Sequence, residues 1–377
     1  MKKIQSIKTI GNIQGKYVLL RTDFNVPIKN GKVVDAFRID TALPTIMYLV
    51  KKGARVLLLS HLGEGKESLA PVAWYLKKYI PKIIHTDDVV GESVLSDCEQ
   101  MKNGDVLLLG NVRKEPGEIS GDKVFALALA GLADIYVNDA FAVSHRKHTS
   151  VVLLPKLLPA YAGLQLIDEM SHLEKVTNNP KTPLVAILSG AKFNTKLPLI
   201  NQYLKKADHI IVAGALLNSL LKARGYEVGK SLVDDGSVDL SKILKSKKLI
   251  LPEDVIVEDK EGKSRTVAIS QVTSKDSIVD IAPKFIVDIT PMIQKAKTIV
   301  WNGPLGKYEA GYDKATKLLL KTVASSKGYS VIGGGDTVAL VSKMKLEKSF
   351  GFVSTGGGAT IDFLATGTLP GIKVLER

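Results

Sequence analysis

The sequence predicts an α/β protein with two doubly wound, Rossmann-like parallel-sheet domains joined by a hinge helix. Short apolar runs rich in β-branched residues alternate with longer amphipathic stretches, which is the pattern of βαβ units. The length of 377 residues exceeds that of one ordinary hydrophobic core and predicts two domains. Many of the apolar runs end in Gly, Asn, Asp or Ser, where a strand must turn toward the next helix.

The composition indicates a globular protein of the cytoplasm without membrane contact. Apolar residues make up 45% of the chain, and none of their runs approaches the roughly 20 residues that a membrane span needs. The charged start, Met1 to Ile4, lacks the small-residue cleavage site of a signal peptide. Cys98 is the only cysteine, so no internal disulfide is possible, which fits a reducing compartment.

The net charge of +14 raises the question of an anionic partner, either nucleic acid or small phosphates. The lysines are spread along the whole chain, without a basic tail or repeated aromatic–basic interleaving. A solvated, lysine-rich surface explains this charge at least as well as a binding role does. We therefore expect no nucleic-acid partner, and the charge by itself selects no function.

The expected strands fall into two sets. Those of the first half are residues 17–21, 55–60, 106–109 and 135–138, and those of the second half are 184–188, 209–212, 248–251, 298–301, 330–332 and 352–354. Two prolines interrupt the pattern near residues 153–159, and a helical stretch over 160–176 follows. The predicted organisation is a first domain over residues 1–155, a hinge helix over 156–176 and a second domain over 177–366.

In the first half, polar or cationic residues stand at or just beyond the end of each apolar run. They are Asp23, Asn25, Arg38, His61, Arg113 and Arg146. In open parallel sheets, ligands bind beyond the carboxyl ends of the strands, so these side chains are expected to converge. Arginine pairs both oxygens of a carboxylate or phosphate at once. Each arginine alone is more commonly a surface ion pair, but the repeated position favours a site for a phosphorylated acid. His145 and His148 suggest a metal, although no further ligand spacing supports one.

The second half carries glycine-rich turns suited to phosphate. Residues 330–337 run from a strand through Gly333, Gly334 and Gly335 to Asp336 and Thr337, where a helix begins. Backbone amides at such a helix start bind phosphate, and Asp336 is a candidate Mg²⁺ ligand. A second turn with Gly356 and Gly357 repeats the arrangement. Gly190 precedes Lys192 and Lys196, whose spacing of four residues predicts that they share one helix face. Two solvated lysines are the commoner explanation of such a pair, but the position directly after a strand and a glycine favours phosphate binding. Asn302, Pro304 and Glu309 follow another strand, where Glu309 is suited to ribose hydroxyls.

Two motifs resemble nucleotide-binding signatures without matching them. Only three residues separate the glycines of residues 225–231, whereas a P-loop needs four. Val338 stands where a GxGxxG pattern requires its last glycine. The sequence therefore supports neither a Walker ATPase nor an NAD enzyme.

These motifs, taken in order, resemble the phosphoglycerate kinase family along nearly the whole chain. The resemblance rests on residues 21–27, 35–39, 60–63, 136–146, 190–196, 251–254, 301–306, 333–337 and 354–359. It implies a cytoplasmic, monomeric transferase of glycolysis and gluconeogenesis. Such an enzyme transfers a phosphoryl group reversibly between 1,3-bisphosphoglycerate and MgADP, giving 3-phosphoglycerate and MgATP, with hinge-bending closure of the two domains. It also implies that residues 367–377 pack back on the first domain.

By this resemblance, six residues of the first half surround 3-phosphoglycerate: Asp23, Asn25, Arg38, His61, Arg113 and Arg146. The nucleotide is served by Gly190, Lys192, Lys196, Gly214, Asn302, Pro304, Glu309, Gly333, Gly334, Gly335, Asp336, Thr337, Gly356 and Gly357, with Asp336 holding Mg²⁺. Arg38, Lys196 and the amides of Gly334 and Gly335 are assigned to the transferring phosphoryl group. Because the attacking group is already a carboxylate, no general base is needed.

The chain departs from the family pattern at several positions. Glu64 stands where the family commonly has an arginine, and Gly110 and Lys114 replace the usual Glu and Phe around residues 111–113. In the nucleotide half, Val212-Ala213-Gly214 replaces a run of three glycines, and Ser189 replaces another glycine. Three other functions stay open at this point: a non-catalytic nucleotide-binding module, a nucleic-acid binder, and a kinase for a different acyl phosphate.

Overall fold

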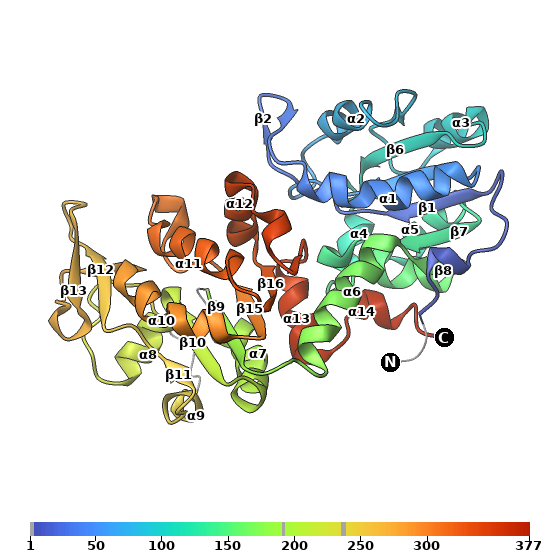
Figure 1. Ribbon diagram of the computed structural model, residues 1–377. Coiled ribbons are helices and arrows are strands. Elements are labelled where there is room, and N and C mark those ends of the chain that lie inside the picture. Colours follow the sequence, from blue (N-terminus) through green and yellow to red (C-terminus); the bar gives the residue numbers. More distant parts are fainter. Residues whose placement is uncertain (1–3, 191–192, 235–238) are drawn as a thin grey trace. The chain divides into compact units, whose positions relative to one another are not determined.

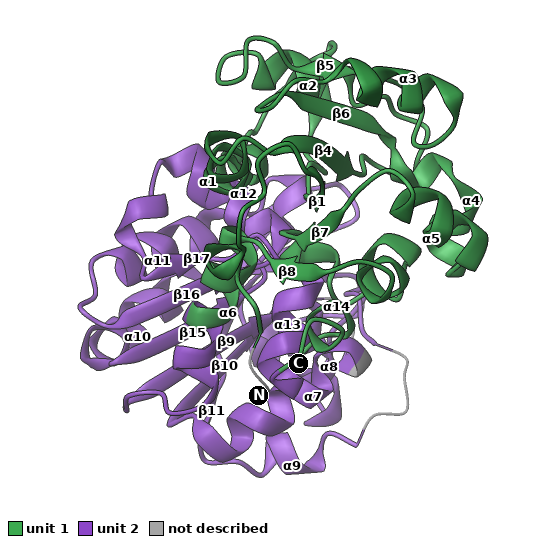
Figure 2. Ribbon diagram, turned by 90° about the vertical axis from the view of Figure 1, so that its right-hand side faces the viewer, with its two compact units in different colours: residues 1–171, 368–377 green, residues 172–367 purple. Residues whose placement is uncertain are grey.

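The structure is a computed structural model that describes residues 4–190, 193–234 and 239–377. The chain divides into two compact units, coloured separately in Figure 2. Unit 1 comprises residues 1–171 and 368–377, and unit 2 comprises residues 172–367. The division falls within helix α6 (Leu164–Thr177). Each unit is built around its own six-stranded sheet, so the predicted class of two parallel-sheet α/β domains is confirmed.

The sheet of unit 1 has the strand order β5-β6-β4-β1-β7-β8, and all its neighbouring strands are parallel (Figure 2). Strands β1, β6, β7 and β8 are also labelled in Figure 1. Its strands are β1 (Tyr17–Arg21), β4 (Arg55–Ser60), β5 (Ile84–His85), β6 (Val106–Asn111), β7 (Ile135–Asn138) and β8 (Ala160–Ala162). After β1 the chain forms β4 beside it, then the edge strand β5, and then β6 between β4 and β5, before it crosses to the other side of β1 with β7. This reversal places a topological switch point at the carboxyl ends of β1 and β7, where open α/β sheets bind ligands.

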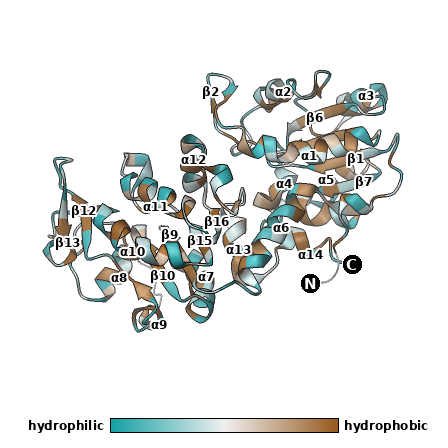
Figure 3. Ribbon diagram, in the orientation of Figure 1, coloured by the Kyte–Doolittle hydropathy of each residue, from teal (hydrophilic) through white to brown (hydrophobic). Residues whose placement is uncertain are grey.

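Helices α1 (Phe37–Lys51), α2 (Ala70–Leu76) and α3 (Glu92–Gln100) contact strands of this sheet. Unit 1 also contains α4 (Pro116–Ser120), α5 (Lys123–Ala130) and α14 (Pro370–Lys373), with the start of α6. In α1 the buried Ile39, Ala42, Ile46 and Leu49 recur every three or four residues, the spacing of one helix face. The core they join is made largely of strand residues that are completely buried, and ribbons such as β6 are coloured as hydrophobic in Figure 3.

The final residues of the chain are held by hydrogen bonds within unit 1. The amide of Gly371 donates to the carbonyl of Ser144 at 2.8 Å, and Asn138 Nδ2 donates to the carbonyl of Gly371 at 3.3 Å. Space is tight here, because a Cβ added at Gly371 would lie 2.6 Å from Val151. This segment belongs to residues 367–377, which the family resemblance predicts to pack back on the first domain.

The sheet of unit 2 is also parallel and six-stranded, with the strand order β11-β10-β9-β15-β16-β17. Its strands are β9 (Leu184–Ser189), β10 (His209–Ala213), β11 (Leu249–Ile250), β15 (Thr298–Asn302), β16 (Tyr329–Gly333) and β17 (Phe352–Val353). Its helices are α7 (Phe193–Lys206), α8 (Gly214–Ala223), α9 (Ser241–Leu244), α10 (Pro283–Lys295), α11 (Lys314–Ala324), α12 (Gly335–Met344) and α13 (Gly358–Thr366). The switch point lies at the carboxyl ends of β9 and β15.

Two small antiparallel elements were not predicted. Strands β12 (Asp254–Glu258), β13 (Ser264–Ala268) and β14 (Ser277–Ile281) form a separate sheet in unit 2, and β2 (Ile28–Lys29) pairs with β3 (Lys32–Val33) in unit 1. The exposed face of β13 leaves it without the continuous apolar run that marks a strand of a buried parallel sheet. The pairing of β12 with β14 joins segments about 20 residues apart, which the local pattern does not reveal.

All ten predicted strands are present, with ends that differ by at most two residues. The expected helix over residues 160–176 begins later, at Leu164, because Ala160–Ala162 pairs with the edge of β7 as strand β8. The helix start is fixed by side chains of unit 1: the Leu164 amide donates to Thr45 Oγ1 at 3.0 Å, and the Leu166 amide donates to Asp139 Oδ1 at 3.1 Å. Among the residues that the structure describes, none of the helices has the length and hydrophobicity needed to cross a bilayer.

Candidate functional site

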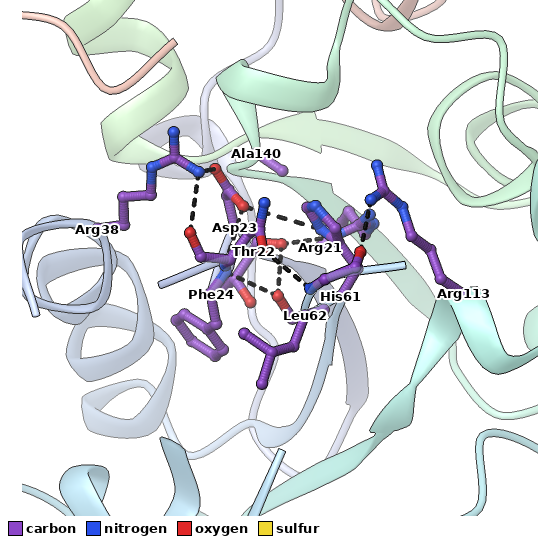
Figure 4. A network of polar contacts seen from close by, with 12 residues as sticks. Arg21, Thr22, Asp23, Phe24, Arg38, His61, Leu62, Arg113 and Ala140 are labelled. Carbon is purple, nitrogen blue, oxygen red and sulfur yellow. Dashed lines mark hydrogen bonds and ion pairs between the residues drawn. The ribbon is translucent and has the colours of Figure 1, made fainter. Parts of the chain in front are cut away.

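Five of the six predicted acid-binding residues of unit 1 lie beyond the carboxyl ends of its central strands. Asp23 and Asn25 follow β1, His61 follows β4, Arg113 follows β6 and Arg146 follows β7, while Arg38 stands in the first turn of α1. Figure 4 shows Arg38, Asp23, His61 and Arg113 gathered around one network of polar contacts. We call the six residues the acid-binding cluster, after the role predicted for them from the sequence. The parallel sheet brings them together because all its strands end at the same edge.

Arg38 is held by the segment that follows β1. Its Nη1 lies 3.0 Å from Asp23 Oδ2 and donates to the carbonyl of Asn25 at 3.1 Å. Asp23 is buried, whereas the Arg38 side chain keeps 26% of its surface exposed. Burial by itself raises the pKa of Asp23, but Arg38 and the other surrounding groups outweigh it, so the pKa is lowered overall. Asp23 is therefore an ionised anchor that orients the guanidinium of Arg38.

His61 is neutral and buried beside Asp23. Its Nδ1 lies 3.8 Å from Asp23 Oδ1. Burial, reinforced by Arg21, Arg113 and Arg38, lowers the pKa of His61 to about 3, although Asp23 acts in the opposite direction. A neutral imidazole next to arginines offers a hydrogen bond to an anionic ligand without adding charge. The cations of the site are therefore the arginines.

Arg113 is fixed through the residues after β4 and β6. Its Nη1 donates to the carbonyl of Gly63 at 2.7 Å, and its amide donates to Asn111 Oδ1 at 3.2 Å. Asn111 Nδ2 in turn donates to the carbonyls of Leu62 and Glu67 at 2.7 and 2.9 Å. The loop after β4 is thus tied to the end of β6, which holds His61 and Arg113 on the same edge of the sheet.

Arg146 is exposed, with its amide donating to the carbonyl of Val143 at 2.8 Å. Its charge is one of those that lower the pKa of Arg113, so the two cations share one electrostatic environment. Burial lowers the pKa of His148, whose Nδ1 lies 3.7 Å from Glu118 Oε1. No group of three or more metal-ligating side chains occurs within residues 4–190, 193–234 and 239–377, so the described chain gives the metal suggested by His145 and His148 no further ligands.

A buried polar network beneath this cluster was not predicted. Arg21 is completely buried; its Nε donates to Ser150 Oγ at 2.9 Å and its Nη1 to the carbonyl of Thr22 at 2.5 Å. Glu118, also completely buried, accepts from the amide and the hydroxyl of Ser150 at 2.9 and 2.6 Å, and lies 3.9 Å from Arg21. Buried charges need such partners. The network supports the backbone that leads to Asp23, and it joins Arg21 to Ser150, 129 residues further along the sequence.

The structure shows the surroundings of Gly110 and Lys114, two positions where the sequence differs from the family pattern. A Cβ at Gly110 would lie 2.2 Å from the carbonyl oxygen of Asp87, so the close passage of that segment leaves no room for a side chain. The Gly110 amide donates to the carbonyl of Asp88 at 2.9 Å. Lys114 is exposed and ends the short helical turn that carries Arg113.

In unit 2, the turn between β16 and α12 has the form of a phosphate cradle. Gly334 has φ +95°, and a Cβ there would lie 2.9 Å from the Gly303 amide nitrogen, so only glycine fits. Helix α12 starts at Gly335, and Asp336 and Thr337 follow in its first turn. The first amides of a helix have no partner within the helix and carry its positive dipole end. The Gly334–Gly335 turn therefore presents donors to an anion.

Lys196 joins this cradle from helix α7. It is buried, and its Nζ donates to Oδ1 of Asn302, the last residue of β15. Both side chains pack closely on glycines. A Cβ added at Gly333 would lie 3.0 Å from Asn302 Nδ2, and a Cβ added at Gly190 would lie 3.2 Å from Lys196 Cε. Burial lowers the pKa of Lys196 to about 8, and no described carboxylate forms an ion pair with it. An ammonium group in this setting is stabilised by a bound phosphate.

This lowered pKa predicts a basic limb in the pH profile. As the pH rises through about 8, Lys196 of the free enzyme loses its proton, so kcat/KM for MgATP is expected to fall. Lys196→Arg keeps its charge at high pH and should move the limb upward by a unit or more, even if its rate is lower. Steady-state measurements between pH 6 and 10 check this. An unchanged limb in Lys196→Arg would show that another group titrates.

A pocket of about 300 Å³ lies next to the cradle in unit 2. Of the predicted nucleotide residues, Gly190, Gly214, Pro304, Glu309 and Asp336 line it. Leu217, Asn218, Ile278 and Asp280 also line it, and these were not predicted. The sequence gives little indication of these lining residues, because α8 and β14 have the apolar pattern of ordinary core elements. A mainly apolar pocket beside phosphate donors suits a nucleoside.

Asp336 and Glu309 form the acidic rim of this pocket. Burial, and then the neighbouring carboxylate of Glu309, raise the pKa of Asp336. A divalent cation relieves this repulsion, and Mg²⁺ prefers one or two carboxylates together with phosphate oxygens. The residues present therefore fit a Mg²⁺ ion that arrives with a nucleotide.

The remaining predicted nucleotide residues lie at strand or helix ends near this region. Thr337 is completely buried in α12, and Gly356 and Gly357 lead into α13, where the Gly356 amide donates to Ser354 Oγ at 3.1 Å. Ser189, which replaces a glycine, donates its hydroxyl to the carbonyl of Pro304. Lys192 lies outside the described residues.

This chain is similar to known proteins over nearly its whole length. The family model described as phosphoglycerate kinase matches residues 7–367. The phosphoglycerate kinase of Pseudothermotoga lettingae is 44% identical, with 99% of this chain and 98% of the relative covered. That of Borrelia garinii subsp. bavariensis is 39% identical, with 99% and 100% covered.

Solved structures give the same result. The phosphoglycerate kinase from Coxiella burnetii is similar with a TM-score of 0.83 and 39% identity, covering 99% of both chains. That from Pyrococcus horikoshii OT3 is similar with a TM-score of 0.87 and 26% identity, covering 99% of this chain and 98% of the other. The family model, the relatives and the solved structures together show that the chain belongs to the phosphoglycerate kinase family.

Proposed function

We infer that the two units of this kinase each bind one of its substrates, the acid on unit 1 and the nucleotide on unit 2. As a phosphoglycerate kinase, the enzyme transfers a phosphoryl group reversibly between 1,3-bisphosphoglycerate and ADP, with MgADP and MgATP as co-substrates, in glycolysis and gluconeogenesis. The assignment of each substrate to a unit is our proposal. It is supported by the contrast between an arginine-rich cluster in unit 1 and a glycine-rich cradle in unit 2.

The acid-binding cluster suits 3-phosphoglycerate, which carries a carboxylate and a phosphate. We assign the anionic groups to Arg38, Arg113 and Arg146, and a neutral hydrogen bond to His61. Asp23 and Asn25 act on Arg38 and the adjacent loop: Asp23 pairs with Arg38, and Asn25 Oδ1 accepts from the Gly63 amide at 3.0 Å. Hydrogen bonds and an ion pair thus orient Arg38 and Arg113 before the substrate arrives.

The nucleotide is assigned to the pocket and cradle of unit 2. The base and ribose take the pocket lined by Gly214, Pro304 and Glu309. The phosphates take the Gly334–Gly335 turn, close to Lys196, Asn302 and Thr337, and Gly356 and Gly357 start the next helix. Lys192 is assigned to the phosphates from the sequence alone. Asp336 holds the Mg²⁺, which neutralises charge on the nucleotide phosphates when it is bound.

The chemistry requires little from the protein beyond positioning and charge. A carboxylate is already a nucleophile, so no proton has to be removed before it attacks the phosphoryl group in line. Arg38 stabilises the charge from the side of the acid, and Lys196 with the amides of Gly334 and Gly335 does so from the side of the nucleotide. Direct transfer requires the two substrates to meet, so we propose that catalysis includes a hinge-bending movement.

One observation carries the assignment of the nucleotide: the buried Lys196, which forms no ion pair with a carboxylate of the described residues, is held by Asn302 beside a glycine turn at a helix start. The test is ATP consumption by the purified protein with Mg²⁺, with and without 3-phosphoglycerate. We expect turnover only when the acid is present. A protein that binds neither ATP nor the acid would overturn the proposal and return the nucleic-acid alternative, which a gel shift across a salt series checks.

We further propose that the enzyme is a cytoplasmic monomer without nucleic-acid or membrane partners. The single cysteine, Cys98, fits a reducing compartment. Sedimentation of the purified protein over a range of concentrations tests the monomer.

A further inference from the structure

An acidic loop lies over one of the proposed substrate-binding arginines. Residues 63–67 follow β4 and carry two exposed carboxylates, Glu64 and Glu67. The loop packs closely on the end of β6, since a Cβ at Gly65 would lie 2.5 Å from the carbonyl oxygen of Arg113. Gly63 is fixed from two sides, because its amide donates to Asn25 and its carbonyl accepts from Arg113. The position of Glu64 next to Arg113 therefore follows from the packing of this backbone.

The contact between Glu64 and Arg113 is electrostatic and exposed. Glu64 Oε1 lies 3.7 Å from Arg113 Nη1, beyond hydrogen-bond distance, while the same Nη1 donates to Gly63 at 2.7 Å. The Glu64 side chain is 89% exposed and that of Arg113 only 12%. An exposed pair of this kind contributes little to folding stability, between about 0 and 1 kcal/mol. Its effect is instead to place a negative charge beside a cation assigned to substrate.

The acid substrate brings further negative charge to the same place. An anionic group of the substrate that pairs with Arg113 must displace the side chain of Glu64 from the guanidinium. It then lies close to the negative charge of Glu64, which repels it. Such repulsion acts on binding of the acid before any chemistry occurs, and it does not touch the nucleotide of unit 2.

We propose that Glu64 lowers the affinity of the enzyme for the phosphorylated acid by competing with it for Arg113. This inference rests on the proposed acid site and deepens it. It has a direct consequence: removing the charge of Glu64 should make the enzyme bind its acid substrate more tightly.

The test compares Glu64→Gln with the wild type at low ionic strength. The Coulomb energy of one charge near a multiply charged anion in a watery environment predicts a decrease in KM and Kd for 3-phosphoglycerate of about threefold to tenfold. The values of kcat and of KM for MgATP should stay unchanged, and the difference should shrink as salt is added. Calorimetric titration with 3-phosphoglycerate alone measures Kd independently of turnover. Glu64→Lys should lower KM further.

The matched control is Glu92→Gln, which removes the same charge from an exposed position of unit 1 at the start of α3. It should leave Kd for the acid unaltered; an equal decrease in both variants would overturn the proposal, because it would reflect net charge alone. Arg113→Ala separates the two levels of inference. If Arg113→Ala raises Kd for the acid but Glu64→Gln leaves it unchanged or raises it, the role of Glu64 is refuted and the acid site stands. If Arg113→Ala has no effect, the acid site itself is refuted.

Discussion

Replacement of Arg38 by alanine is expected to lower kcat by about a thousandfold or more, because a guanidinium that stabilises a transferring phosphoryl group contributes mainly in the transition state. The KM for 3-phosphoglycerate should change only several-fold, since Arg113 and Arg146 still hold the acid. The structure gives Arg38 the required orientation through Asp23 and the carbonyl of Asn25 while leaving part of its side chain exposed. Steady-state kinetics with both substrates varied measure this split.

Arg38→Lys serves as the informative companion, because it keeps the positive charge but loses the planar fork. Its kcat should fall between those of Arg38→Ala and the wild type. Lys51→Ala, at the exposed end of the same helix, controls for a cation lost from α1. Near-normal turnover of Arg38→Ala would remove Arg38 from the catalytic role.

Replacement of Asp336 by alanine is expected to lower kcat/KM for MgATP by about tenfold to a hundredfold and to raise the Mg²⁺ concentration needed for half-maximal activity. The carboxylate stands in the first turn of α12 on the rim of the pocket, where Glu309 repels it in the absence of a cation. Binding of 3-phosphoglycerate should be unaffected. Titration of activity with Mg²⁺ at fixed ATP measures the effect.

Asp362→Ala, an exposed carboxylate in helix α13, is the control for this change and should leave the Mg²⁺ titration unaltered. An Asp336→Ala enzyme with the Mg²⁺ requirement of the wild type would contradict the assignment of Asp336 to the metal. Glu309 would then be the remaining carboxylate of the pocket rim to test.

The parallel sheets could be predicted well because their strands are buried on both faces. Strands β1, β4 and β7 match the predicted residues 17–21, 55–60 and 135–138, since a continuous apolar run is a signal contained in a few neighbouring residues. Strand β8 escaped prediction for the opposite reason: Ala160–Ala162 is short, and it is a strand because β7 offers it an edge. The antiparallel sheet of β12, β13 and β14 likewise depends on pairing between separate segments.

The candidate site residues could be listed from sequence because ligands meet the carboxyl ends of parallel strands. That rule places Asp23, His61 and Arg113 at one edge of a sheet, and Asn302 and Gly334 at one edge of another. Lining residues such as Leu217 and Ile278 could not be found in this way, because they face the pocket from core elements whose apolar pattern is ordinary.

The sequence by itself determined the two-domain α/β class, most of the buried strands, and the residue types available at each strand end. Only the tertiary structure decided their electrostatic states, because charges and burial act across space between residues far apart in the chain. The pairing of Arg21 with Glu118 and the approach of Glu64 to Arg113 join residues that lie about 50 positions or more apart in sequence. The lowered pKa of Lys196 depends on how deeply its side chain is buried. Such properties follow from packing, which no local pattern records.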